Sequence, residues 1–184
     1  MAIKSQIENR NFLSPTGFKF ILQRTPKVSF FANTVNIPSL SMGNATQPTY
    51  LKDIPIPGDK IEYGDFTLRF IVDENLENYM QIHKWIRGLG YPESLKEIFD
   101  LQNEEEAGRP KRETIGMDIY SDGTLQVLNS SYNSQFNVVF KDMFPVELSS
   151  LDFDATNNDI EYFTAEVTFK YTIYNIEDTK GNRL

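Results

Sequence analysis

Short runs in which apolar and polar residues alternate recur along most of this chain. Successive side chains of a strand point to opposite faces, so alternation predicts a β-strand with one buried face. Gly, Pro, Asn, Asp and Ser gather between the runs, as expected for turns. About seven or eight strands separated by such turns predict a β-sandwich or barrel. The predicted strands are Phe18–Leu22, Val28–Val35, Phe66–Val72, Gly116–Tyr120, Gly123–Asn129, Phe136–Phe140 and Phe163–Ile176.

The sequence also predicts one hairpin between two of these strands and one further turn. Phe18–Leu22 and Val28–Val35 are joined by Thr25-Pro26-Lys27, and we expect them to form a hairpin. Ser121-Asp122-Gly123 has turn composition and is predicted to separate two further strands.

The stretch Asp53–Ile86 joins a strand to the one clear helix of the chain. Apolar residues recur there at helical spacing, which predicts an amphipathic helix. Asp73 or Asn75 is expected to cap its N-terminus, and Gly88 and Gly90 are expected to end it. The predicted fold class is mainly β with one helix, in a single domain spanning 1–184. The apolar stripe of the helix contains Leu76, Tyr79, Met80, His83 and Ile86, and is widened by Ile82, Trp85 and Leu89.

Two long segments between the strands lack a clear period. The first, 36–52, is rich in Pro, Ser, Asn, Gln and Thr and is predicted to be a loop. Loops of this length in small domains are usually functional or disordered. The second, 91–115, is predicted to be an exposed, charge-rich insertion with a short helix running from Pro92 to Leu101. Residues 1–11 and 177–184 are expected to be flexible termini.

Isolated apolar residues and two prolines near the first segment are candidate contacts with a neighbouring subunit. Ile37, Leu40 and Met42 are apolar residues in a largely polar loop. Pro55 and Pro57 hold the following backbone extended and cannot donate a ladder hydrogen bond.

Charge and composition exclude several functional classes. The formal net charge is −8, whereas nucleic-acid-binding surfaces are basic. The acidity either keeps the chain soluble or lets a surface face DNA without binding it. With no cysteine and a single histidine, the chain can form no disulfide and no two-histidine metal site. No apolar run could span a membrane and no signal peptide begins the chain, so we expect a soluble protein made in the cytoplasm.

No group of residues predicts catalysis or cofactor binding. His83 lies on the helix stripe, where a partly buried structural histidine is a better interpretation than a general base. Gly88-Leu89-Gly90 sits at the end of a helix and lacks the pattern of a phosphate-binding loop. Asp152, Asp154 and Asp159 lack the glycine and the closing glutamate of a calcium loop. We therefore expect no enzyme activity, no cofactor and no metal.

An ordered series of motifs resembles the tail tube proteins of contractile-tailed, T-even-like phages. The series contains the Gly58-Asp59-Lys60 turn, the strand from Phe66, the Asp73-Glu74 stop and a helix closing on Ile82–Trp85. The C-terminal third resembles the closing segment of the same family. It contains Phe144-Pro145, Leu148, Leu151-Asp152-Phe153-Asp154, Asn157-Asn158-Asp159-Ile160 and the last alternating strand.

This resemblance implies a virion structural protein of the phage tail, assembled in the host cytoplasm. Family members form hexameric rings that stack into a tube, and sheets of neighbouring subunits make the inner wall. The implied partners are further copies of the chain and the tail sheath, tape measure, baseplate or neck proteins, with no membrane. DNA would pass through an acidic lumen without specific binding during ejection. Alternatives with the same fold are a tube initiator, a terminator, a tail completion protein, or the tube protein of a bacterial contractile injection system.

Overall fold

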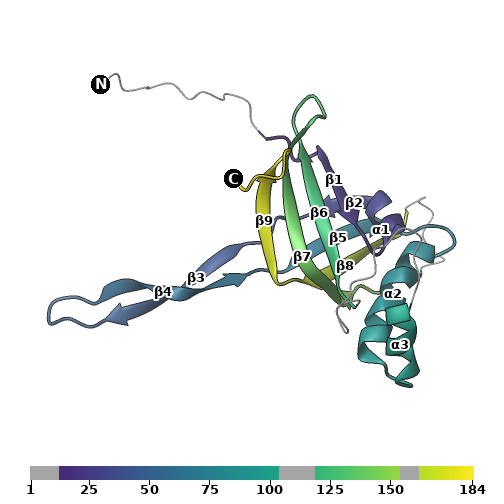
Figure 1. Ribbon diagram of the computed structural model, residues 1–184, viewed down its shortest axis with the longest axis horizontal. Helices are drawn as coiled ribbons and strands as arrows, with labels where there is room; N and C mark the ends of the chain where they lie inside the picture. Colours follow the sequence, from purple (N-terminus) through teal and green to yellow (C-terminus); the bar gives the residue numbers. More distant parts are fainter. Residues whose placement is uncertain (1–12, 104–118, 154–161) are drawn as a thin grey trace.

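The computed structural model describes residues 13–103, 119–153 and 162–184, which form a bent double sheet with helices on one side and a long arm on the other (Figure 1). The mainly β class is confirmed, with one long helix and two shorter ones in the described residues. Within these ranges the elements are β1 Phe18–Leu22, α1 Pro26–Phe30, β2 Ala32–Val35, β3 Leu40–Gln47, β4 Ile54–Tyr63, β5 Phe66–Ile71, α2 Glu77–Gly90, α3 Lys96–Asn103, β6 Ser121–Leu128, β7 Ser134–Leu148, β8 Thr164–Lys170 and β9 Ile173–Asp178.

Strand β7 belongs to both halves of the seven-stranded sheet, whose order is β1-β6-β7-β8-β5-β2 with β9 also paired to β7. Its first part, Phe136–Lys141, lies between β6 and β9, and its last part, Phe144–Leu148, pairs with β8. All these pairings are antiparallel. The chain thus builds one sheet from β1, β6, β7 and β9 and a second from β7, β8, β5 and β2.

The core lies where the inner faces of the two sheets meet. Phe66 is fully buried at its centre, with its ring centroid 5.0 Å from Phe20, 4.7 Å from Phe140 and 6.1 Å from Phe169. Trp85 of α2 closes one side, because its ring packs on Phe169 and its Nε1 donates a 2.8 Å hydrogen bond to the Ile119 carbonyl. Buried aromatic rings stabilise a core through the apolar area that they bury and through the preferred geometry of their mutual contacts.

The face of α2 that packs on the sheet differs from the predicted stripe. Asn78, Ile82, Trp85 and Gly88 are buried, whereas Leu76 and Met80 are 37% and 40% exposed. The side chain of Asn78 sets this rotation, since it donates to the carbonyl of Ile71 at 2.8 Å and so ties the helix to the end of β5. His83 is exposed, so its predicted partial burial is wrong.

The expected capping of α2 is met only in part. The N-cap position is Leu76, in left-handed conformation with φ 57°, and its side chain makes no capping hydrogen bond. Asp73 nevertheless supplies its Oδ1 as acceptor for the Asn78 backbone amide at 3.4 Å. A carboxylate at this end also suits the positive end of the helix dipole.

The predicted strand Val28–Val35 is wrong in its first half. Pro26 starts the short helix α1, where its fixed φ is favourable, and only Ala32–Val35 forms a strand. The predicted hairpin is also wrong, because β1 pairs with β6 and β2 pairs with β5.

Two further turns and strands differ from the prediction. Ser121-Asp122-Gly123 is no turn but the start of β6, where the Ser121 hydroxyl accepts a hydrogen bond from the Arg24 amide at 3.1 Å. The run Phe163–Ile176 is two strands, because β8 ends at Lys170 and β9 begins at Ile173. This break lets the chain pass from the second sheet to the first.

Two segments predicted to lack regular structure contain strands. Residues 36–52 include β3, and residues 177–184 include the end of β9 and a hydrogen-bonded return. The short helix predicted from Pro92 is present as α3, which runs from Lys96. Residues 1–11, the later part of the insertion (104–115), most of the strand expected from Gly116, and Asp154 and Asp159 lie outside the described residues.

Candidate assembly surfaces

The strands β3 and β4 form a two-stranded sheet of their own, which we call the arm together with its connecting residues 48–53. The arm projects away from the body (Figure 1). Every residue of β3 is exposed, as is nearly every residue of β4. An isolated two-stranded hairpin is at best marginally stable in water. The arm therefore has the character of an element that packs against another chain.

The register of the arm gathers apolar side chains on one face of its inner half. Leu40 pairs with Tyr63 and Met42 with Ile61, so these side chains lie together, since residues two apart in a strand share a face. Leu40, Met42 and Ile61 are 57%, 56% and 52% exposed. Large apolar side chains gathered and exposed in this way mark interaction sites more often than isolated ones do.

The structure brings some of the predicted contact residues together and separates others. Leu40 and Met42 share a face, and Pro55 and Pro57, both exposed, share a face farther out, opposite Thr46 and Asn44. Ile37 is exposed but precedes β3. The sequence prediction missed the exposed arm residues Ile54, Ile56 and Ile61 and the tip residues Tyr50 and Leu51. The alternation of isoleucine and proline at 54–57 is the signal that could have revealed the outer ones.

A bulge separates the inner and outer halves of the arm. The register shifts between Met42 and Asn44, and the backbones of Gly43 and Gly58 meet there. A Cβ at position 58 would lie 2.4 Å from the Gly43 carbonyl oxygen, so only glycine permits this approach. Bulges increase the local twist, so the two halves present their faces in different directions.

Hydrogen bonds and aromatic rings hold the base of the arm. The hydroxyl of Tyr174 donates to the carbonyl of Pro38 at 3.3 Å, and the side chain of Asn36 bonds Asp65 and Thr67 of the returning chain at 3.0 and 2.7 Å. The Tyr63 ring packs edge-on against Tyr174 at 5.5 Å. The beginning of β9 thus helps to hold the base of the arm.

The first sheet ends at β1 on one side and at β9 on the other. No strand pairs with the outer edge of β1 in the described part of the chain, and the outer edge of β9 is bonded only by the short segment 182–184. A hollow of about 450 Å³ runs beside β1, between that strand and α1, and is lined mainly by apolar side chains. Open strand edges present unpaired N–H and C=O groups and invite a further strand. The residues that line the hollow are Phe18, Lys19, Phe20, Ile21, Leu22, Pro26, Ser29 and Ala32.

The outward face of this sheet is mostly uncharged. One row of paired residues crosses it as Lys19, Gln126, Asn137 and Glu177, from β1 to β9. The neighbouring row contains Ile21, Thr124, Val139 and Asn175. In the first row, the cation and the carboxylate thus stand at opposite edges of one face.

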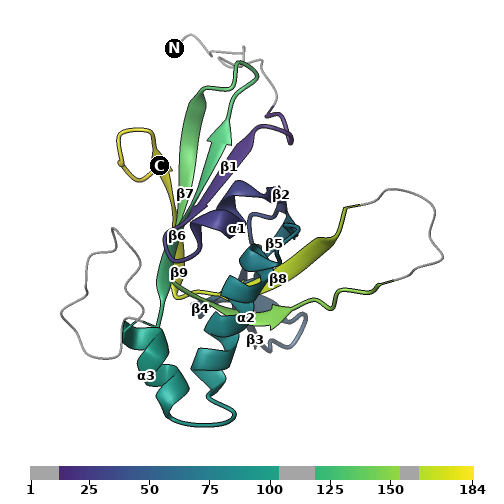
Figure 2. The same cartoon turned by 90° about the vertical axis from the view of Figure 1, so that its right-hand side faces the viewer.

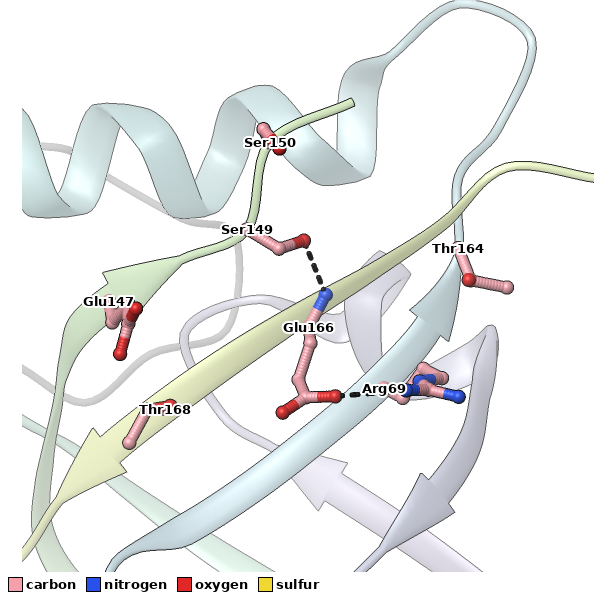
Figure 3. A pocket seen from close by; sticks show the side chains of 7 residues that line it. All are labelled: Arg69, Glu147, Ser149, Ser150, Thr164, Glu166 and Thr168. Atoms are coloured by element: carbon pink, nitrogen blue, oxygen red, sulfur yellow. Dashed lines mark hydrogen bonds and ion pairs between the residues drawn. The ribbon is translucent and has the colours of Figure 1, made fainter. Parts of the chain in front are cut away.

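A polar hollow of about 420 Å³ lies on the outward face of the second sheet (Figure 3). Arg69 and Glu166 form an ion pair of 3.2 Å across it, and the Glu166 amide donates to the Ser149 hydroxyl at 2.9 Å. Sites for small molecules are usually lined by apolar groups, which this hollow lacks. Within the described ranges no cluster of His, Asp or Glu could hold a metal ion.

An exposed two-stranded arm and a sheet that ends in an unpaired strand edge at β1 define the class of protein to which this chain belongs, namely the subunit of a larger assembly. The family model for phage tail tube proteins matches residues 4–177. The chain therefore belongs to the phage tail tube protein family, and it is a structural component of the virion tail. No helix in the described part of the chain is long and apolar enough to cross a membrane.

Individual relatives support this assignment. The tail tube terminator protein of Enterobacteria phage T4 is 25% identical over 174 residues, covering 91% of this chain and 90% of that protein. The cap that terminates the anti-feeding prophage tube has the same fold, with TM-score 0.62, 15% identity and coverage of 97% and 100%. The sheath–tube complex of the extracellular contractile injection system PVC contains a chain with TM-score 0.57, 18% identity and coverage of 97% and 100%.

Proposed function

We propose that this protein is the terminator of a contractile tail tube, a ring of copies that closes the end of the tube. The observation that carries the proposal is the relationship to the phage T4 terminator, which extends over about nine-tenths of both chains. The sequence alone favours the repeating tube subunit, whereas this relationship favours the terminator. A hexameric ring is the arrangement that the family resemblance implies.

The first sheet supplies a candidate ring wall. Its strands alternate in direction from β1 through β6 and β7 to β9, so β1 of a second copy would lie antiparallel to β9 of the first. Such head-to-tail contacts close into rings when the rotation between copies allows it. Strand pairing around the ring would also pair the β1 edge of each copy with the β9 edge of the next.

The outward face of the same sheet would then line the channel. Its outward charges are Lys19, Asp122, Lys141 and Glu177, two of each sign, so the wall would be close to neutral rather than acidic as the sequence suggested. A wall of amides, hydroxyls and few cations gives DNA little to bind, because phosphate contacts need clustered Lys or Arg. DNA would pass without being held.

The arm would carry the contact with an adjacent ring or neighbouring copy. Leu40 and Met42 form its inner apolar face with Ile61, and Ile37, Pro55 and Pro57 lie on the same exposed segment. Covering this surface would offset the marginal stability of an isolated hairpin. Sheath, tape measure and neck or baseplate proteins are the further partners that this role requires.

The test combines electron microscopy of the purified protein with its addition to growing tubes of the matching tube subunit. A terminator should form single rings, or remain unassembled, and should shorten the tubes and occupy one of their ends. Long tubes grown from the purified protein alone would identify the repeating subunit instead. Tubes of unchanged length with bare ends would contradict the terminator assignment.

A further inference from the structure

The chain reverses direction directly after β9. Gly181 has a left-handed φ of +82°, and its amide donates a 3.0 Å hydrogen bond to the carbonyl of Asp178. The hydroxyl of Thr179 adds a 3.1 Å bond to the Asp178 carboxylate. Figure 2 shows this reversal as the yellow loop next to the C label. The loop places residues 182–184 alongside β9.

Residues 182–184 pair with the outer edge of β9. The Asp178 amide donates to the Asn182 carbonyl at 2.8 Å, and the Leu184 amide donates to the Ile176 carbonyl at 3.0 Å. Glu177 and Arg183 thereby form an antiparallel bridge. Neighbouring residues of a strand direct their N–H and C=O groups to opposite sides, and in β9 the Asp178 amide and the Ile176 carbonyl point away from β7. The returning segment therefore fills the side that β7 leaves free.

The two edges of the sheet thus differ. The β1 edge lies beside an apolar hollow of about 450 Å³ that could admit a strand, whereas the β9 edge already carries a short one. The returning segment buries little, since Leu184 is 79% exposed and residues 179–184 are all exposed. A strand with buried apolar side chains would gain more by occupying the same edge.

We propose that residues 182–184 are an intramolecular placeholder for a second copy of this chain. In the free subunit they cover the β9 edge, and at ring closure the β1 strand of a neighbouring copy displaces them. This inference rests on the proposed ring and adds that the returning segment determines when the ring closes. A covered edge prevents random edge-to-edge association until many copies are brought together.

Two variants and one control test the placeholder. Deletion of residues 181–184 removes it, and Gly181→Val disfavours the φ of +82° on which the reversal depends. Lys180→Ser alters the same exposed turn while leaving its backbone unchanged and serves as the control. Self-association is measured by analytical ultracentrifugation and mass photometry over a concentration series. We expect the midpoint concentration for association to fall by about tenfold in both variants, because a neighbouring strand no longer has to displace the two backbone hydrogen bonds that hold residues 182–184 on β9. The control should keep the wild-type midpoint.

Hydrogen–deuterium exchange gives an independent readout. In the free chain the amides of Asp178 and Leu184 should be protected, and on association that of Leu184 should become exchangeable while Phe18 and Phe20 of β1 gain protection. Equal midpoints for all chains, no association of the truncated chain, or continued protection of Leu184 in the assembled species would overturn the placeholder. Failure to act at tube ends would instead remove the terminator assignment and leave these results standing.

Discussion

The hydroxyl of Tyr171 donates a 2.8 Å hydrogen bond to the carbonyl oxygen of Gly64, which joins the β8–β9 break to the base of the arm. Tyr63 and Tyr174 pack their rings against Tyr171, each with ring centroids 6.1 Å apart. Burial raises the pKa of Tyr171 from 10.0 to about 12, and the charges of neighbouring groups add to the shift. The direction of the arm thus depends on a phenol that must stay protonated.

Folding stability should fall at alkaline pH through Tyr171. A pKa raised in the folded state means that the stabilisation is complete below about pH 10 and is lost as the pH rises through about 12. Tyr171→Phe removes this dependence but also removes the hydrogen bond, which costs about 1 kcal/mol at neutral pH. Urea denaturation at about pH 8 and about pH 11 should show the gap between wild type and variant narrowing.

Tyr132→Phe is the matched control for that measurement, since Tyr132 is 73% exposed on a surface turn. Its stability should follow that of the wild type at both pH values. A constant gap between Tyr171→Phe and wild type across the alkaline range would contradict the assigned role of burial.

Phe66→Ala should strongly destabilise the fold. The ring is completely buried and contacts three further rings from β1, β7 and β8. Truncation leaves a cavity and should lower the free energy of unfolding, measured by thermal denaturation, by about 3–5 kcal/mol. Phe99→Ala, on the exposed side of α3 at 57% exposure, should cost less than about 1 kcal/mol by the same measurement. Similar losses in both variants would mean that the core is not centred on Phe66.

The parts of the fold that the sequence predicts best are those with one buried face. β5 shows strict alternation from Phe66 to Ile71, and the period changes to a helical one after Asp73, so both β5 and α2 are predictable. β3 has no buried face in the single chain, and its sequence therefore carries no alternation to detect. β7 passes through two sheets, and its partners are distant in sequence, so the alternating pattern underestimates its length.

The assembly surfaces are predictable to a smaller extent. Leu40 and Met42 can be singled out because they are apolar within a polar segment. The open edges cannot be predicted, because an edge is defined by the absence of a partner strand in the folded sheet. Lys19 and Glu177 are distant in sequence, so the sequence alone does not show that they end the same row of cross-strand pairs.

Leu40→Ser combined with Met42→Ser should prevent assembly without unfolding the chain. Both side chains are more than half exposed, so their loss should change the free energy of unfolding by less than about 1 kcal/mol. The same loss at an apolar contact between copies should cost far more, because those side chains would be buried there. Electron microscopy and thermal denaturation of the same preparations separate the two effects.

Leu95→Ser combined with Phe99→Ser provides a control of similar exposure, on and beside α3. This pair should leave self-association unchanged. If the arm variant still forms rings and acts on tube ends, the inner face of the arm makes no essential contact.

Reversing the charges at the two sheet edges should identify the junction between copies. Lys19 and Glu177 end the same row of paired residues, so edge-to-edge pairing brings Lys19 of one copy near Glu177 of the next. Lys19→Glu and Glu177→Lys would each place like charges there and should raise the midpoint concentration for association by about fivefold or more at low salt. The double reversal restores opposite charges and should return the midpoint close to that of the wild type. Each single variant should keep its thermal stability, which a mass photometry series and a thermal scan can establish together. Additive weakening in the double variant, with no rescue, would show that these two edges do not meet.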